Sequence, residues 1–262
     1  MHPPSDAVLA EFGVTGGRGQ SLRRLAGGRG LTWRAGDIVL RPSVGDGETT
    51  WKAAVLAGLP HSEAFRTPRP IEARRGSWSV DGWEAWQWVP GRTDETRVHE
   101  VRAAGDAFHD AIAGLRRPDF LDLADDPWAR SDRIAWEEEP LPRATALERL
   151  ADAFRPVTDR SQMIHGDLLG NVMFAPGEPP AIIDWAPYWR PVGFADAIVL
   201  VDAACWHGLR ADAMRDVAEG IVDGAQLLVR ALVFRIATLQ LLGRWDAQME
   251  NRHSSVIEAA LA

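Results

Sequence analysis

Hydrophobic and polar positions follow one pattern up to about residue 90 and another after it. In the first part, short apolar runs alternate with glycine and proline turn signals. Residues 20–42 predict three strands with turns between them, the second at Ala35-Gly36-Asp37. A short helix is expected over 48–59, followed by strands at 69–75 and 78–89, the latter with a hairpin turn at Asp81-Gly82.

Helical spacing takes over from about residue 95, with helices predicted over 95–115 and 140–154. Short strands are expected at 162–167, 171–175 and 181–185, with a turn in 176–180, and the chain after Trp189 is predicted to be helical. The sequence thus predicts an α+β fold with a β-rich N-lobe (1–90), a hinge at Pro90-Gly91 and a larger, mostly helical C-lobe (91–262).

Composition and charge narrow the class of protein. A hydrophobic content of 46% with 25% charged residues is typical of a soluble globular chain. The formal net charge of −8 argues against a nucleic-acid partner and is compatible with a cationic substrate. Cys205 is the only cysteine, and Arg230 and Arg235 interrupt the most apolar late stretch, which favours a buried helix over a membrane span. The single cysteine and the interrupted apolar stretch favour a cytoplasmic protein without a membrane partner. The first residues, which lack the layout of a signal peptide, agree with this expectation.

Three polar residues in the C-lobe have the spacing of a phosphoryl-transfer site. Asp167 and Asn171 share the loop of "HGDLLGN" between two strands, and Asp184 follows seventeen residues after Asp167, at the end of "AIID". A hairpin of that length brings Asp184 back beside Asn171. Carboxylate and amide oxygens suit Mg²⁺, and one more carboxylate can orient the attacking hydroxyl.

The motifs "HGDLLGN" and "IIDW", in this order, resemble those of the aminoglycoside phosphotransferase/choline kinase-like family, and the resemblance covers nearly the whole chain. It implies a two-lobed protein-kinase-like fold and ATP-dependent transfer to a hydroxyl of a small molecule, with GTP as a possible donor. By this resemblance, Asp167 is the catalytic base, Asn171 and Asp184 hold Mg²⁺, and His165 braces the loop.

The chain departs from the family pattern at two places. Asn171 lies four residues after Asp167 instead of five, and Gly170 is expected to provide the backbone freedom for the tighter turn. The third strand carries Arg41 where antibiotic kinases and protein kinases carry lysine. Arginine can still hold phosphates, and Glu48 on the following helix is the candidate for its acidic partner, although Arg41 could also be a surface residue.

Other candidate nucleotide contacts lie in the N-lobe. Gly27, Gly28 and Gly30 form a loop between two strands, where a kinase-like fold covers the phosphates, although such a loop alone is more often a plain turn. At the hinge, Trp88 and Val89 are expected to face adenine, with a hydrogen bond from the Val89 amide.

Several aromatic and acidic residues are ambiguous. Core packing is favoured for Trp86 and Trp185, whereas Tyr188 and Trp189 are candidates for the acceptor pocket. Asp196 and Asp202, on an expected helix, could line that pocket or cap and solvate the helix.

Three functions fit these observations. The first is a Mg²⁺-assisted kinase that phosphorylates an aminoglycoside-, sugar- or amino-alcohol-like acceptor. The second is a nucleotide-binding pseudokinase with a regulatory or interaction role, suggested by the short loop and Arg41. The third is a metal-dependent hydrolase with His165, Asp167 and Asp184 as ligands, which no further histidine cluster supports.

Overall fold

The chain forms two compact units in a computed structural model that describes residues 2–14, 21–25 and 30–262. The first unit comprises Met1–Arg92 together with Met173–Ile183, and the second comprises Thr93–Val172 together with Asp184–Ala262. Each unit is described by itself below.

The first unit is built on a sheet with the strand order β1-β2-β3-β6-β4, to which β5 adds by pairing with β6. The elements are α1 (Asp6–Glu11), β1 (Arg23–Arg24), β2 (Trp33–Ala35), β3 (Ile38–Pro42), α2 (Asp46–Gly58), β4 (Pro70–Ile71), β5 (Ser79–Val80), β6 (Trp83–Gln87) and β7 (Arg92–Thr93). The predicted hairpin turn is confirmed, because Asp81 and Gly82 both adopt positive φ angles of 48° and 77° between β5 and β6.

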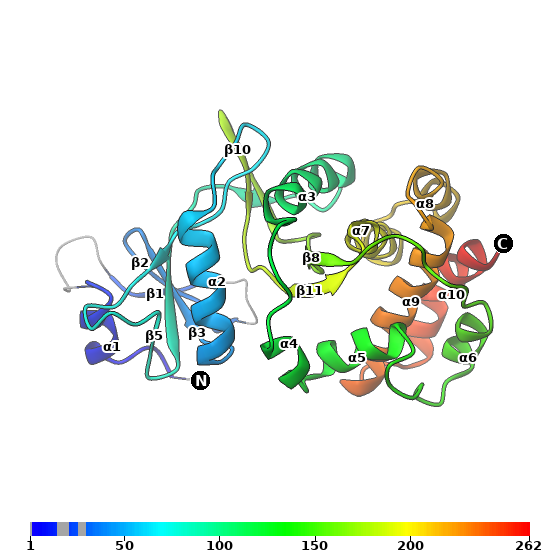
Figure 1. Cartoon of the computed structure of the whole chain (residues 1–262), viewed down its shortest axis with the longest axis horizontal. Helices are drawn as coiled ribbons and strands as arrows, with labels where there is room; N and C mark the ends of the chain where they lie inside the picture. Colours follow the sequence, from blue (N-terminus) through cyan, green and yellow to red (C-terminus); the bar gives the residue numbers. More distant parts are fainter. Residues whose placement is uncertain (1, 15–20, 26–29) are drawn as a thin grey trace. The chain divides into compact units, whose positions relative to one another are not determined.

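Alternation along the central strands gives the sheet two different faces. Leu40 and Ala85 point into an apolar core with Val8 of α1. Arg41 and Glu84, one position along each strand, pair across β3 and β6 on the opposite face. Thr49 of α2 donates to the Glu84 carboxylate there, and Figure 1 shows α2 alongside these strands. This face is therefore polar at its centre.

The hairpin of β9 (Val172–Ala175) and β10 (Glu178–Ile182) belongs mainly to the first unit, although the sequence analysis assigned it to the C-lobe. The reason is backbone pairing with Arg66, whose amide donates to the Pro180 carbonyl at 2.9 Å and whose carbonyl accepts from the Ile182 amide at 2.8 Å. Residues 178–180 extend the strand instead of forming the predicted turn. Pro180 is tolerated there because its carbonyl, and not a backbone N–H, takes part in the pairing with Arg66.

The second unit is mostly helical. Its elements are α3 (Val98–Ile112), α4 (Phe120–Leu123), α5 (Pro127–Ala135), α6 (Thr145–Asp152), β8 (Gln162–His165), β11 (Pro187–Arg190), α7 (Val192–Trp206), α8 (Ala211–Ala218), α9 (Gly224–Leu241) and α10 (Ala247–Leu261). Helix α9 packs against α5, α6, α7, α8 and α10, as Figure 1 shows in orange. It has the length and composition of a membrane span, but its apolar window is 67% buried within the protein, as expected of a core helix.

The strand β11 was not predicted. It pairs antiparallel with β8, and Pro187 lies opposite His165. Pro187 and Pro191 are turn signals, and residues 187–190 show no alternation of apolar and polar side chains, so the sequence alone does not predict a strand here. Only the pairing with β8 defines it. This ladder fixes the start of the loop that carries Asp167.

Candidate active site

The loop with Asp167 begins directly after β8. The Gly166 amide donates to the Ala186 carbonyl at 3.0 Å, which extends the pairing of β8 with β11 by one residue. A Cβ atom on Gly166 would lie 2.4 Å from the ring of Tyr188, so the backbone can pass this ring only as glycine. The Gly in His-Gly-Asp is therefore a packing requirement, and it places Asp167 at the first position beyond the strand.

Two buried histidines brace this loop. The Asp167 amide donates to Nδ1 of His165 at 3.1 Å, and the His165 amide donates to Nε2 of His109 at 2.9 Å. Burial, with a smaller contribution from His165, lowers the pKa of His109 to about 3. His109 is therefore neutral at pH 7, as an acceptor for an amide must be. The predicted structural role of His165 agrees with this geometry, whereas His109 was missed.

The short spacing between Asp167 and Asn171 corresponds to a tight turn. The Asn171 amide donates to the Leu168 carbonyl at 2.8 Å, and Gly170 has a φ of 87° at the third position of this turn. The buried Leu168 side chain anchors the turn against α3, where a Cβ atom on Gly105 would lie 2.5 Å from it. The expected use of Gly170 for backbone freedom is thus confirmed.

The side chain of Asn171 is held by Asp167. Its amide nitrogen donates to the Asp167 carbonyl at 2.7 Å and to Oδ2 of the same residue at 3.2 Å. Because the nitrogen faces Asp167, the amide oxygen is the atom left to act as a ligand. An amide oxygen is a hard donor of the kind that Mg²⁺ accepts.

Asp184 follows β10 and precedes the β11 ladder. It is exposed and has a φ of 51°, a conformation that aspartate tolerates better than most residues. The next residue, Trp185, is buried and donates from its indole to the Ile164 carbonyl at 3.0 Å. The chain at Asp184 is thus tied to β8, three residues before Asp167. Core packing of Trp185 is confirmed.

Asp167 is also ion-paired. Nη2 of Arg235, on α9, lies 2.8 Å from Oδ1 of Asp167. The same guanidinium binds both carboxylate oxygens of Asp202 on α7, with Nε 2.8 Å from Oδ1. Burial opposes the charge of Arg235, but the carboxylates of Asp202 and Asp167 outweigh it and raise the pKa above the ordinary value. Arg235 therefore stays charged.

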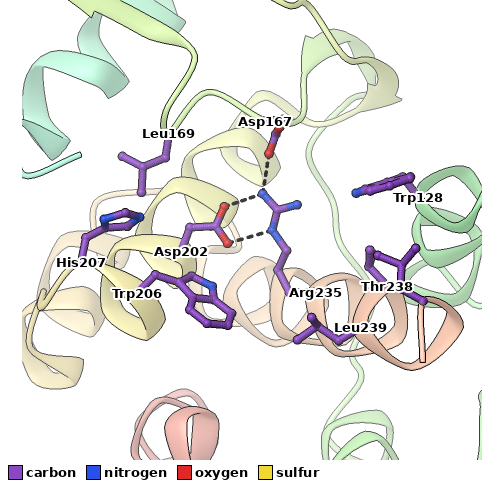
Figure 2. A pocket seen from close by; sticks show the side chains of 10 residues that line it. Trp128, Asp167, Leu169, Asp202, Trp206, His207, Arg235, Thr238 and Leu239 are labelled. Atoms are coloured by element: carbon purple, nitrogen blue, oxygen red, sulfur yellow. Dashed lines mark hydrogen bonds and ion pairs between the residues drawn. The ribbon is translucent and has the colours of Figure 1, made fainter. Parts of the chain in front are cut away.

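These residues lie in the wall of a pocket in the second unit, which has a volume of about 270 Å³. Figure 2 shows the Arg235 guanidinium between Asp167, Asp202 and the ring of Trp128. The polar lining consists of Asp167, Asp202, His207, Arg235 and Thr238. The apolar lining consists of Trp128, Leu169, Trp206, Leu239 and Leu242. Asp202 therefore lines a pocket, while its predicted place in the acceptor site stays a prediction.

The remaining candidates for this pocket lie elsewhere. Tyr188 packs edge-on against Phe234, with ring centroids 5.8 Å apart, and Asp196 forms a two-fold ion pair with Arg102. Neither these two residues nor Trp189 belong to the pocket lining. Sequence reasoning named neither Trp128 nor Trp206, and it named Arg235 only as an interruption of a helix.

In the first unit, Arg41 binds the carboxylate of Glu84. Nε of Arg41 contacts Oε1 of Glu84, whose side chain is 2% exposed. Glu84 also accepts from the Thr49 hydroxyl at 2.8 Å and the Trp86 indole at 2.9 Å. The prediction that Trp86 is a core residue is confirmed by its burial.

Glu84 therefore takes the place that the sequence analysis gave to Glu48. Glu48 forms an ion pair with Lys52 one turn along α2, at 2.8 Å. The prediction relied on the helix that follows β3, whereas the partner comes from the neighbouring strand β6. The register of β3 and β6, which places Glu84 opposite Arg41, identifies this partner.

The other residues predicted to contact the nucleotide are in the glycine loop and at the hinge. Gly27 and Gly28 lie outside the described residues. Gly30 has a φ of 67°, and its carbonyl accepts from the Arg24 side chain. Arg34 stacks on the ring of Trp88, 3.8 Å from its centroid, and the Trp88 amide donates to the Asp37 carbonyl at 2.7 Å.

Val89 follows with a buried side chain, and its amide has no acceptor among the described residues. A backbone donor at this position is what the predicted hydrogen bond to adenine requires.

The geometry does not favour a metal-dependent hydrolase. His165 is fully buried, and its Nδ1 lone pair already accepts from the Asp167 amide. Within residues 2–14, 21–25 and 30–262, no group of three or more His, Cys, Asp or Glu side chains is arranged to hold a metal ion.

Comparisons with known proteins agree with the arrangement. The model of the phosphotransferase enzyme family matches residues 46–190, and a search of curated protein sequences finds no match. Similar solved structures include an aminoglycoside phosphotransferase from Alicyclobacillus acidocaldarius, with 16% identity, a TM-score of 0.58 and coverage of 99% of this chain and 94% of that one.

Two further solved structures are similar in the same way. A spectinomycin phosphotransferase in complex with ADP and spectinomycin has 15% identity, a TM-score of 0.55 and coverage of 92% of each chain. An amicoumacin kinase in complex with AMP-PNP, Ca²⁺ and Ami has 13% identity, a TM-score of 0.55 and coverage of 91% of this chain and 86% of that one. At these identities the likeness establishes the protein-kinase-like α+β fold, and the family match over 46–190 shows that the chain belongs to the phosphotransferase enzyme family.

Proposed function

We propose that this protein is an ATP-dependent, Mg²⁺-assisted kinase that phosphorylates a hydroxyl group of a small molecule. The observation that carries the proposal is the position of Asp167. Its carboxylate lies in the wall of the pocket of about 270 Å³, in the part of the chain that the family model matches. A pocket of this size is near the lower end of small-molecule sites, which favours a small acceptor or the end of a larger one.

Asp167 would orient the acceptor hydroxyl and accept its proton as the oxygen attacks the phosphorus. Oδ1 accepts from Arg235 and Oδ2 from Asn171, and each carboxylate oxygen has a second lone pair for the hydroxyl. Both protein contacts fix the carboxylate in one orientation. Positioned general bases contribute about 10²–10⁴ in rate.

The metal would be held by the amide oxygen of Asn171 and the carboxylate of Asp184. The orientation of the Asn171 amide supports this, because its nitrogen is already committed to Asp167. When bound, Mg²⁺ neutralises negative charge on the phosphate oxygens and keeps several water ligands, so two protein ligands suffice.

Arg41 would hold the nucleotide phosphates, and Val89 would donate its amide to the purine. Glu84 supports the first role because its buried carboxylate fixes the guanidinium of Arg41 through Nε. Several of the similar solved structures contain AMP-PNP or ADP, which supports ATP over GTP as the donor.

A pseudokinase is the second candidate, and the observation that favours it is the ion pair between Arg235 and Asp167. Arg235 already occupies Oδ1 of the carboxylate that a kinase would present to the acceptor hydroxyl.

Substitution of Asp167 by Asn separates the two functions. The change is isosteric and removes the proton acceptor, so ADP release in the presence of an acceptor should fall about 10²–10⁴-fold. Thermal stabilisation by ATP·Mg²⁺ should remain. Asp212→Asn, on an exposed helix start, is the matched control and should leave both readouts unchanged. Equal turnover of the wild type and the Asp167→Asn variant would contradict the role of Asp167.

A further inference from the structure

The proposed acceptor pocket already contains a positive charge. Arg235 belongs to the core helix α9, and its side chain is 14% exposed. Its guanidinium reaches the pocket wall, where Figure 2 shows it between the two carboxylates. A cationic acceptor would have to bind beside this group.

Asp202 is the main partner of Arg235. Its side chain is 12% exposed, and Nε and Nη2 of Arg235 bind its two carboxylate oxygens. Such a fork-to-carboxylate pair is strong and geometrically fixed. The carboxylate of Asp202 is therefore neutralised by the protein itself and is not offered to a ligand.

The pocket consequently has little negative charge. Asp167 and Asp202 contribute two negative charges at most and Arg235 contributes one positive charge, which leaves a net charge of −1. His207, the remaining titratable residue of the lining, can only make this value less negative. A molecule with several ammonium groups would leave most of them without a carboxylate partner, and desolvating unpaired charges is costly.

The rest of the lining suits a flat, apolar body. Trp128 comes from α5 and Trp206 from the end of α7, while Leu239 comes from the last turn of α9 and Leu242 directly follows that helix. Trp206 is 38% exposed, an unusual degree for a tryptophan of a compact unit. Thr238 donates its hydroxyl to the Phe234 carbonyl, so it adds no donor to the pocket.

We propose that Arg235 sets the charge preference of this site, which would take an uncharged or singly positive alcohol with an aromatic or similarly flat part instead of a polycationic aminoglycoside. The inference rests on the proposed function and specifies its substrate class. Arg235 is thereby a specificity-determining residue, and it also positions the carboxylate of Asp167.

Three variants change the charge of the pocket in steps. Asp202→Asn brings the net charge to 0, Arg235→Gln brings it to −2, and the double variant Arg235→Gln/Asp202→Asn returns it to −1 with neither charge present. Binding should follow the net charge and not the identity of the side chains. The double variant is also the structural control, because it removes the unpaired buried charge that either single variant leaves.

Three probes of different charge are compared in each variant by isothermal titration calorimetry: phenyl β-glucoside, 2-amino-1-phenylethanol and kanamycin. We expect the wild type to bind the first two more tightly than kanamycin. In Arg235→Gln, the affinity for kanamycin relative to phenyl β-glucoside should rise about tenfold or more, because one charge-assisted contact becomes available. In Asp202→Asn, 2-amino-1-phenylethanol should lose affinity relative to phenyl β-glucoside, and the double variant should resemble the wild type.

Tightest binding of kanamycin by the wild type would overturn the proposal, as would ratios that stay the same across the variants. If Arg235→Gln does not fold, Asp202→Asn and the double variant still decide the question through 2-amino-1-phenylethanol. ADP release measured with the same probes distinguishes this inference from the proposed function. Turnover with a polycationic preference contradicts only the inference, whereas charge-dependent binding without any turnover contradicts only the kinase.

Discussion

Arg41 in the first unit and the loop of Asp167 in the second are held in place by different forces. Arg41 is fixed by charge, through the buried carboxylate of Glu84 on the neighbouring strand. The backbone of the loop is fixed by shape and by neutral hydrogen bonds, through the contact of Gly166 with Tyr188 and the amide that donates to His109, and only the Asp167 side chain is ion-paired, with Arg235. The first site should therefore be sensitive to the loss of a partner charge, and the second to an added methyl group or to acid.

The largest effect is expected at the charged site. Glu84→Ala removes a buried carboxylate that binds Arg41, Thr49 and Trp86, so the free energy of unfolding should fall by about 3–5 kcal/mol. Chemical denaturation measures the change. Glu258→Ala is the control, since it removes an exposed ion pair with Arg149 and should cost about 1 kcal/mol or less. Comparable losses in the two variants would contradict the assignment of Glu84 as the partner.

The loop should respond next, to a single methyl group. In Gly166→Ala the new Cβ would lie 2.4 Å from the Tyr188 ring, so the ring or the loop must shift. Such overpacking destabilises proteins by about 1–3 kcal/mol, and acceptor-dependent turnover should fall with it because Asp167 moves. Gly114→Ala, whose Cβ would meet nothing within 4 Å, should have little effect on either quantity. A melting temperature equal to that of Gly114→Ala would show that the contact is unimportant.

Much of the loop was predictable, because the residues concerned are neighbours in the sequence. The order of strand, His-Gly-Asp, tight turn and Asn follows from local patterns, and Gly170 adopts the positive φ that the shortened spacing requires. The partners that complete the loop come from distant segments. His109 lies on α3 and Arg235 on α9, and nothing in the sequence specifies which turn of a helix will face Asp167.

The error about Glu48 has the same origin. A carboxylate close in sequence to Arg41 was preferred, but strand register decided in favour of Glu84, 43 residues away. Similarly, Tyr188 and Trp189 were predicted to line the acceptor pocket because they follow Asp184 closely in the sequence. The pocket is lined instead by Trp128 and Trp206, which come from two helices. Tertiary packing, which a single sequence does not encode in local patterns, accounts for both.

Acid should weaken the second unit through His109. The pKa of His109 is about 3 in the folded protein because of its burial, below the ordinary value of 6.5. The unfolded chain therefore takes up the proton first, and stability is complete above pH 6.5 and declines as the pH falls towards 3. The loss should reach about 2 kcal/mol at pH 5.

Unfolding curves of the wild type and of His109→Gln, recorded from pH 7 to pH 5, isolate this contribution, since glutamine can still accept from the His165 amide but does not titrate. Identical pH dependence of the two proteins would mean that His109 does not contribute.

The smallest effect concerns nucleotide affinity in the first unit. Arg41→Gln removes a charged contact to phosphate, and the dissociation constant for ATP·Mg²⁺ should rise about tenfold, more at low salt than at high salt. The affinity for an acceptor should stay the same. Isothermal titration calorimetry of both ligands measures the two effects, and an unchanged ATP affinity would assign Arg41 to structure alone.

The central claim is that the pocket of Asp167 receives a phosphoryl group on an acceptor hydroxyl. The most direct measurement is ³¹P NMR of the wild-type protein with ATP·Mg²⁺ and an acceptor mixture of uncharged and singly positive alcohols, with the Asp167→Asn variant beside it. We expect a phosphomonoester signal that grows together with ADP in the wild type and is strongly reduced in the variant. Binding of ATP without any phosphomonoester, in the presence of every acceptor, would rule out the kinase and identify a pseudokinase.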